Sequence, residues 1–237
     1  FYNANNIAAF DSVRPRILGT WDFVNNESDV YDDGSHGENT FSCIAANLPN
    51  KFIGTAPGAY FYLFVTEDDS KEWIMEEYNW AAAAEIADSA GAQIFSTSLG
   101  YTEYDGGEGS HTYADLNGHN TLITCAANMA FGKGILVLNS AGNEGAKPWK
   151  YIAAPADGDS VLAIGAVDST GKVTSFSSRG PNAAGLVKPD LCAQGQNSAV
   201  VSTGGGVGYS NGTSFSCPIM AGCFASLWSA FPNKTAH

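Results

Sequence analysis

The chain is poor in basic residues and has no long apolar stretch. Of 237 residues, 11 are Lys or Arg and 24 are Asp or Glu, which gives a formal net charge of −13. Nucleic-acid backbones and anionic lipid surfaces repel such a protein, so we expect neither as a partner. No apolar run reaches the length of a membrane-spanning helix. The composition therefore favours a protein that acts on neither nucleic acids nor membranes.

Cysteine is also scarce, with five residues in the chain. An odd number leaves at least one thiol without a disulfide partner in the chain, and the spacing does not fit a zinc site. Each cysteine stands among apolar or small neighbours, which predicts buried thiols packed as small hydrophobic side chains. A cysteine nucleophile is therefore not expected. The five are Cys43, Cys125, Cys192, Cys217 and Cys223.

Apolar strands alternate with helical segments along the chain. Hydrophobic residues make up 44% of the sequence, enough for one large core. Strands are predicted at 16–24, 59–65, 93–98, 135–140, 160–167, 172–178 and 197–203, and helices at 36–48, 71–92, 121–134 and from Ser214 onward. Strands separated by helices indicate an α/β fold with a mostly parallel sheet covered on both faces. No linker or repeat interrupts the pattern, so we expect one domain over 1–237.

Two segments of this pattern give finer expectations. The polar, glycine-rich stretch 101–120 is expected to be a surface loop, and loops of this length are often functional. The segment 71–92 predicts a long amphipathic helix. Its three- and four-residue spacing runs through Ile74, Tyr78, Ala81 and the pair Glu85/Ile86.

The stretch "GYSNGTS" (208–214) offers two serines as a nucleophile. Ser210 fits the G-x-S-x-G elbow of α/β-hydrolases, but that architecture needs an acid and then a histidine further along the chain. No Asp or Glu follows Ser210, and the only later histidine is His237. Ser214 begins a predicted helix, whose free N–H groups suit a developing oxyanion. The sequence therefore favours Ser214.

Around Ser214 the chain resembles the subtilisin-like serine proteases, the subtilase family, and in detail most of all those of Bacteroidetes bacteria. "GTSFSCPIMAG" is similar to the serine motif of the family, and "SHGENTFSCIAA" to its histidine motif. Further similar blocks are "STSLG", "SAGNEG", "FSSRGP" and "KPDLCAQG". The blocks stand in family order over almost the whole chain. The resemblance implies a three-layer α/β fold and a serine endopeptidase that works through an acyl-enzyme.

The resemblance also implies a role for each matching residue. Ser214 would be the nucleophile, His36 the general acid and base, and Asn143 the oxyanion donor. Further substrate-binding residues would be Ser98, Leu99, Gly100 and Gly142. The family needs no cofactor for its chemistry. It often binds structural calcium, although no ligand run of known spacing stands in this sequence. Protein or peptide substrates, a monomer, and a location outside the cell or in its envelope are implied as well.

The triad aspartate has two alternative positions. Asp11 follows apolar residues, but Ser12 and Val13 stand where the family has a small residue and then glycine. We favour the alternative, in which 1–13 form the next loop and the aspartate strand precedes Phe1. The chain would then be an internal piece of the catalytic domain that also lacks a C-terminal helix and strand.

Glu38 departs from the histidine motif of the family. We expect its carboxylate to point to solvent from the first helical turn, where it favours the helix dipole. The alternative is that it raises the pKa of His36.

A second function class is a truncated or degenerate subtilase that binds peptides without turnover. Labelling of Ser214 by a fluorophosphonate separates this class from an active peptidase. A nucleotide site at "GGGVG" (204–208) is rejected because no helix follows those glycines directly.

Overall fold

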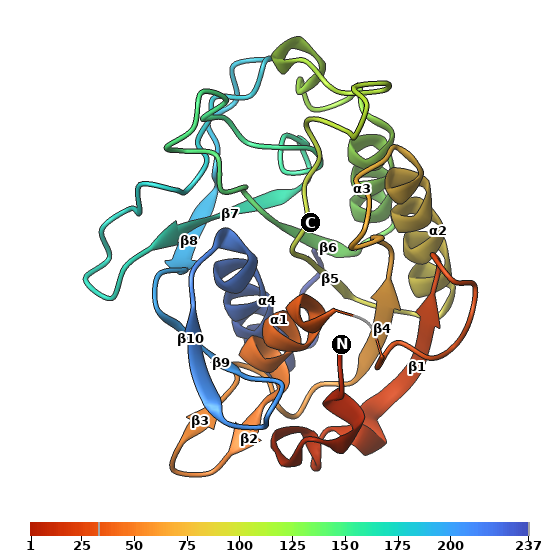
Figure 1. Ribbon diagram of the computed structural model, residues 1–237, viewed down its shortest axis with the longest axis vertical. Helices are drawn as coiled ribbons and strands as arrows, with labels where there is room; N and C mark the ends of the chain where they lie inside the picture. The colour runs from red at the N-terminus through yellow and green to blue at the C-terminus, as the bar shows by residue number, and fades with distance from the viewer. Residues whose placement is uncertain (33, 237) are drawn as a thin grey trace.

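A computed structural model describes residues 1–32 and 34–236, which form a layered α/β structure (Figure 1). The strands are β1 (Ile17–Asp22), β2 (Asn47–Leu48), β3 (Phe52–Ile53), β4 (Phe61–Val65), β5 (Ile94–Thr97), β6 (Leu136–Ser140), β7 (Leu162–Val167), β8 (Leu191–Gln194), β9 (Ser198–Val201) and β10 (Val207–Ser210). The α-helices are α1 (Ser35–Ala45), α2 (Met75–Ser89), α3 (Leu122–Gly132) and α4 (Thr213–Ala230). Short 3₁₀ turns are η1 (Ala4–Asn6), η2 (Ala8–Phe10), η3 (Arg14–Arg16) and η4 (Tyr113–Asp115).

The middle layer consists of two separate parallel sheets. One has the strand order β5-β6-β7-β8, and the other pairs β1 with β4. Every residue of β6 is buried, as expected for a strand inside a parallel sheet that is covered on both faces. Among the residues that the structure describes, no strand pairs with β4 or β5 on the sides that face each other. The layer is therefore interrupted between β4 and β5.

Helices cover both faces of this layer. α4 packs against the four-stranded sheet with α1 at its side, and α2 packs beside α3 on the opposite face (Figure 1). The close approach on the α4 side needs a glycine, because a Cβ on Gly222 would overlap the side chain of Thr55. The predicted three-layer α/β architecture with a mostly parallel sheet is confirmed.

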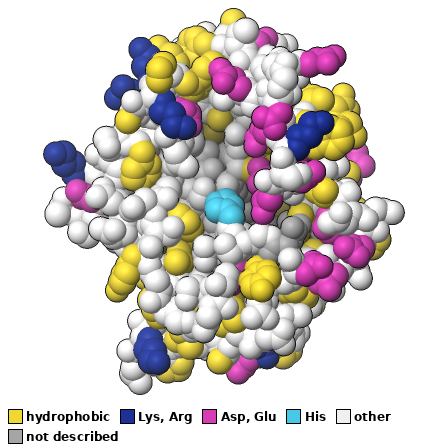
Figure 2. All heavy atoms as spheres, in the orientation of Figure 1, with side chains coloured by type: hydrophobic (Ala, Val, Ile, Leu, Met, Phe, Trp, Pro, Cys, Tyr) yellow, Lys and Arg dark blue, Asp and Glu magenta, His cyan; other side chains and the backbone are white. Residues whose placement is uncertain are grey.

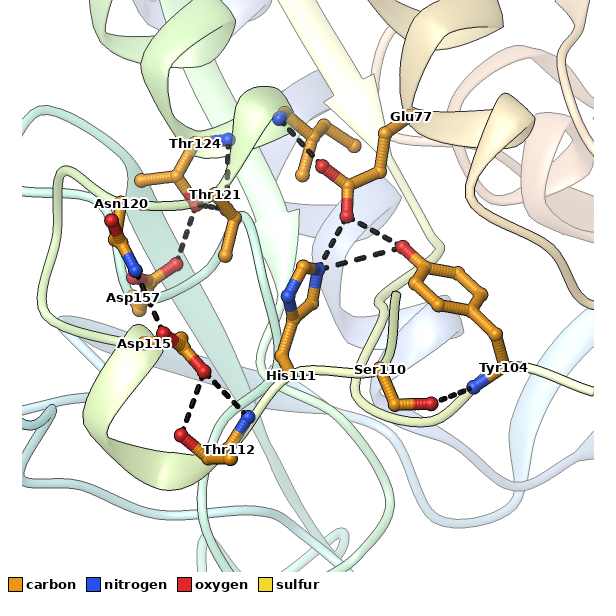
Figure 3. A network of polar contacts seen from close by, with 11 residues as sticks. Glu77, Tyr104, Ser110, His111, Thr112, Asp115, Asn120, Thr121, Thr124 and Asp157 are labelled. Carbon is orange, nitrogen blue, oxygen red and sulfur yellow. Dashed lines mark hydrogen bonds and ion pairs between the residues drawn. The ribbon is translucent and has the colours of Figure 1, made fainter. Parts of the chain in front are cut away.

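The loop 101–120 is more buried than a surface loop should be. Half of its residues are exposed, but Tyr101, Tyr104 and Leu116 are buried. Figure 3 shows His111 and Tyr104 directed at the buried carboxylate of Glu77 on α2, which the Tyr104 hydroxyl and the His111 ring both contact. The expectation of a surface loop was thus only partly right, because these contacts hold its two ends against α2 and α3.

The predicted strand 172–178 is wrong. That segment turns back on β7, and only Val173 forms an isolated bridge, to Val167. Thr174 N donates to Ala166 O at 3.0 Å, and Ser177 Oγ accepts from Ala166 N at 3.0 Å, so one backbone bond and one side-chain bond stand in place of a ladder. On the side away from β6, β7 pairs with β8, which lies inside the block "KPDLCAQG", where no strand was predicted.

The predicted apolar face of α2 is also wrong. Tyr78 and Ile86 are about half exposed, whereas the buried positions include Glu77, Trp80 and Ala87. The helix is rotated because the Glu77 carboxylate finds its partners inside the protein and Trp80 packs in the core around Tyr101. Tertiary contacts thus override the periodicity of a short alanine-rich segment.

The expectation that all five thiols are buried holds for two of them. Cys43 and Cys217 are buried, while the other three are exposed, and all five are free thiols. Apolar neighbours in sequence do not decide burial, because adjacent residues point about 100° apart in a helix, as at Cys125 and Cys223, and to opposite faces in a strand, as at Cys192. The exposed ones are Cys125, Cys192 and Cys223.

Candidate active site

Ser214 lies at the start of α4, where the chain enters the helix through Gly212. Gly212 has φ of +152°, a conformation that favours glycine, and Ser214 is 9% exposed. The Ser214 hydroxyl lies 3.4 Å from the carbonyl oxygen of Ser98, and the Ser98 hydroxyl donates to the carbonyl of Ser214 at 2.8 Å. These contacts join the end of β5 to the first turn of α4. Ser98, a predicted substrate-binding residue, thus lies beside Ser214, the predicted nucleophile.

Asn143 is held against the same helix start by its side-chain oxygen. Its Oδ1 accepts from the backbone N–H of Thr213 at 2.9 Å and from the Thr213 hydroxyl at 3.0 Å. Both bonds use the oxygen, so the Nδ2 donor is not consumed by the pair. A Cβ built on Gly212 would lie 3.7 Å from Nδ2, which places this donor next to the chain that leads into Ser214.

Gly142 and Gly100 serve the backbone geometry of the site. Gly142 has φ of +105°, and a Cβ there would lie 2.9 Å from the Ser178 hydroxyl. A Cβ on Gly100 would lie 3.0 Å from the Cβ of Ala153. Both positions therefore require glycine for close packing. The neighbouring carbonyl of Leu99 is occupied, since it accepts from Asn139 Nδ2 at 3.0 Å.

His36 is the second residue of α1, which packs against α4. Its ring lies edge-on to Phe215, with 6.3 Å between the ring centroids. No hydrogen bond joins the ring to Ser214 or to any other residue within 1–32 and 34–236. The surrounding protein lowers the pKa of His36 by desolvating the imidazolium, an effect that the charge of Asp69 opposes. The structure thus brings His36 near Ser214 but leaves the pair unengaged.

A groove of about 690 Å³ separates β4 from β5 and reaches His36 and Ser98. α2 and α4 line its two faces with mostly apolar side chains, including those of Trp80 and Trp228. Figure 2 shows this face of the molecule hollowed near its centre. The groove therefore lies where the middle layer is interrupted, directly beside the candidate site.

Asp11 is not part of this site. It follows η2 in a stretch of 3₁₀ turns, and its carboxylate pairs with Arg14 at 2.6 Å. The side chain of Asp11 is 61% exposed. The structure therefore places this carboxylate in a surface loop, without a contact to His36.

Glu38 is fully buried, contrary to the expectation that it points to solvent. It shares a face of α1 with Ser42 and Ala45, both also at 0% exposure, and Ser42 Oγ accepts from Val201 N on β9. Neither carboxylate oxygen of Glu38 has a hydrogen-bond partner among the described residues. Burial raises the pKa of Glu38 to about 7. The position in the helix, not the preference for its dipole, decides where this side chain points.

The acidic segment "TEDDS" (66–70), which was not predicted as part of the site, borders it. Asp69 packs so closely on Gly34 that a Cβ there would overlap its carboxylate. Glu67 and Asp69 both line the groove that His36 lines. The available signal was three acids in a row after a buried strand, at the carboxyl edge where parallel sheets carry their sites.

Two further features concern metal ligation and membrane-spanning helices. Across 1–32 and 34–236, no group of three or more His, Cys, Asp or Glu side chains is arranged to hold a metal ion. No helix in the same residues is long and apolar enough to cross a bilayer.

Comparison with known proteins gives a consistent relationship. Residues 3–237 match the model of the subtilase family. The chain is 32% identical to Subtilisin E of Bacillus subtilis (strain 168), over 96% of this chain and 55% of that protein. It is 31% identical to Subtilisin of Bacillus pumilus, over 96% of this chain and 76% of that protein. The chain thus spans little more than half the length of Subtilisin E.

Solved structures agree with the sequence relatives. The S41 psychrophilic protease superposes with a TM-score of 0.75 at 25% identity, covering 99% of this chain and 76% of that one. Sphericase has the same fold, with a TM-score of 0.75 at 24% identity over 96% of this chain and 75% of that one. The fold, the order of the motifs and the family match all agree, and the chain belongs to the subtilase family.

Proposed function

We propose that this chain is the catalytic part of a serine endopeptidase. The Ser214 hydroxyl attacks the carbonyl carbon of a peptide bond while His36 accepts its proton. His36 then donates the proton to the leaving amine, which leaves an acyl group on Ser214. Water, deprotonated by His36, then attacks the acyl carbon. The bond between that carbon and Ser214 Oγ breaks, His36 returns the proton to Oγ, and the new carboxyl end of the peptide is released. No cofactor enters these steps.

The observation that carries this proposal is that Thr213 fixes the side-chain amide of Asn143 by two hydrogen bonds. Because Oδ1 of Asn143 accepts two bonds from Thr213, one residue before the nucleophile, Nδ2 is fixed beside Ser214 as a donor. A tetrahedral intermediate carries negative charge on the former carbonyl oxygen. Nδ2 and the free N–H groups at the start of α4 can stabilise that charge.

His36 still needs an acid to orient it and to balance its charge in the transition state. We propose that a further strand, lying outside 1–237, fills the groove between β4 and β5 and carries that aspartate. Parallel edges on both sides, and α2 and α4 on the two faces, supply what a buried central strand requires. With this strand, and with a further C-terminal helix and strand, 1–237 would form one catalytic domain.

Peptides or proteins are the proposed substrates. An extended peptide would run along Ser98, Leu99 and Gly100, and its reacting carbonyl would lie between Ser214 and Gly142. We further propose a monomer that acts outside the cell or in its envelope, by analogy with the bacterial relatives. Structural calcium is part of the proposal, and metal analysis of the purified protein tests it.

The test is substitution of the two competing serines in the full-length protein. Ser214→Ala should abolish fluorophosphonate labelling and lower kcat about 10⁶-fold, the scale known for the nucleophile of subtilisin, a relative. Ser210→Ala, which removes a half-buried hydroxyl at the end of β10, is the matched control and should keep both. Peptide binding without labelling in the unsubstituted protein would support the alternative, a subtilase fold that binds peptides without turnover.

A further inference from the structure

An acidic hollow of about 290 Å³ lies beside the groove, where β4 leads into α2. Its lining holds six acidic residues: Glu67, Asp68, Asp69, Glu72, Glu76 and Asp105. The basic residue of the lining, Lys71, places its Nζ over the ring of Trp73, 4.5 Å from the centroid, and forms no ion pair with these acids. The hollow therefore gathers six acidic side chains around one lysine, with which none of them forms an ion pair among the described residues.

Glu76 shows that the hollow lacks a hydrogen-bond donor as well as a neutralising charge. The residue is 1% exposed, and its Oε1 accepts from the backbone N–H of Asp68 at 2.9 Å. Its Oε2 is buried and has no hydrogen-bond partner among the described residues. A buried carboxylate oxygen without a donor is costly. A cationic donor that entered the hollow would remove that cost.

The other acids of the hollow show the same lack of compensation. Burial and the neighbouring charge of Glu76 raise the pKa of Glu67 to about 8, and burial raises the pKa of Glu76 to about 7. Glu67 has one neutral donor, the Tyr101 hydroxyl, at 3.4 Å. The carboxylates thus repel one another in the empty hollow and would ionise more readily around a cation.

The hollow opens towards the candidate active site. Glu67 and Asp69 belong to its lining and also to that of the groove shared by His36 and Ser98. Figure 2 shows acidic side chains gathered beside the central hollowed region. A peptide bound along Ser98 would therefore pass within reach of the hollow.

We propose that this acidic hollow binds the Lys or Arg side chain of a peptide that extends along Ser98, Leu99 and Gly100. The inference rests on the proposed peptidase function and gives it a substrate class, peptides with a basic residue near the cleaved bond. A metal ion is the poorer occupant, because these carboxylates do not converge as a ligand set. An ammonium or guanidinium group carries three or five donors on a flexible stem and suits dispersed acceptors.

The test measures binding, so that it does not depend on turnover. Labelled octapeptides of neutral residues, with one Lys or one norleucine placed in turn at each position, are titrated against full-length protein carrying Ser214→Ala. Norleucine keeps the length of lysine without its charge. At the preferred position we expect the Lys peptide to bind at least about tenfold tighter, measured by fluorescence anisotropy.

Two variants locate the effect. Glu76→Gln and Glu67→Gln should each lower the Lys-to-norleucine ratio to about threefold or less and leave norleucine affinity unchanged. Glu103→Gln, at an exposed acid of the neighbouring loop outside the hollow, should leave the ratio intact. Equal affinity of the two peptides, or a preference that survives both hollow variants, overturns the inference. Fluorophosphonate labelling of the unsubstituted protein tests the peptidase proposal separately.

Discussion

Two histidines of this chain lie near acidic residues in very different settings. His111 contacts the Glu77 carboxylate, which also accepts from the Tyr104 hydroxyl and from the N–H of Ile123 at 3.0 Å (Figure 3). Burial alone would raise the pKa of Glu77, but these hydrogen bonds lower it. His36 lies in the groove without a hydrogen-bond partner among the described residues. One centre is satisfied and closed, and the other is unsatisfied and open.

The difference separates anchoring from chemistry. An acid–histidine pair resembles part of a catalytic triad, but at Glu77 no nucleophile is in reach and every acceptor is used, so the pair fixes loop 101–120. At His36 the proposed nucleophile, the proposed oxyanion donor and a groove lie close by, and no acid forms a hydrogen bond with the ring among the described residues. Unused hydrogen-bonding capacity beside an opening therefore marks the functional centre of this fold better than the presence of an acid–histidine pair.

Among the tests of this contrast, the first and largest effect concerns the proposed aspartate outside 1–237. Residues 1–237 expressed by themselves should show about 10⁴-fold lower kcat than the full-length protein, the scale seen on removing the triad aspartate of subtilisin. The open edges of β4 and β5 should also make this product prone to aggregation. Hydrolysis of a casein-type substrate and light scattering check both. Extension by one strand that ends in an Asp-x-Gly sequence should restore activity.

Asp11 supplies the control for that experiment. Its carboxylate is exposed and paired with Arg14, so Asp11→Asn should change kcat less than about twofold in the full-length protein. If 1–237 alone were active and Asp11→Asn abolished that activity, Asp11 would be the triad acid. The contrast between a paired and an unpaired histidine would then fail.

The next effect concerns the oxyanion donor. Asn143→Ala should lower kcat by about 10² to 10³ with KM nearly unchanged, because the amide meets a charge that forms in the transition state. Steady-state kinetics on a peptide substrate measure the changes in kcat and in KM separately. A large rise in KM at constant kcat would instead assign Asn143 to ground-state binding. Asn128→Ala, which removes a structural amide on α3, should alter stability and not this split.

The closed centre should respond in the opposite way. His111→Ala removes a partner from a carboxylate at 0% exposure and should lower the free energy of unfolding by about 3 kcal/mol. Urea denaturation measures this loss, and kcat per folded molecule should stay within about twofold. His36→Ala should do the reverse, with activity lost and stability kept. A loss of kcat in folded His111→Ala would contradict the separation of the two centres.

The sequence predicted the layers of the fold well, because fully apolar strands such as β6 and the small-residue helix α4 leave little choice. It placed Ser214, His36 and Asn143 in three segments that the structure brings together around the first turn of α4, where Asn143 bonds to Thr213 and His36 lies edge-on to Phe215. It failed for the buried face of α2. That face is set by Glu77, whose hydrogen-bond partners lie far away in the sequence. No periodicity within a helix contains that information.

The same limit explains the acids around the site. Asp69 and Glu76 gain their setting from a hollow made by two segments, and the sequence shows only an acidic turn. Glu38 was expected at the surface because a helix start favours acids, yet α1 turns that position toward β9. Local preference amounts to less than about 1 kcal/mol, so the packing of an entire helix outweighs it.

Glu38 provides the smallest and sharpest test, since it is a buried acid with neither a histidine nor any other donor. Its pKa is about 7 in the folded chain, above the usual value in the unfolded chain, so the folded state binds more protons between those two values. Stability is therefore fully present below about pH 4.5 and decreases as pH rises through 7. Glu38→Gln should be nearly neutral at pH 5 and stabilising by about 2 kcal/mol at pH 9.

Urea denaturation at the two pH values distinguishes this mechanism from a general effect of charge. Glu85→Gln removes the same charge from an exposed position on α2 and should shift stability at neither pH. If Glu38→Gln gained nothing at pH 9, the carboxylate would have a donor in the folded protein. Glu38 would then resemble Glu77, whose carboxylate has hydrogen-bond donors. The contrast between the two centres would then depend on His36 and no longer on Glu38.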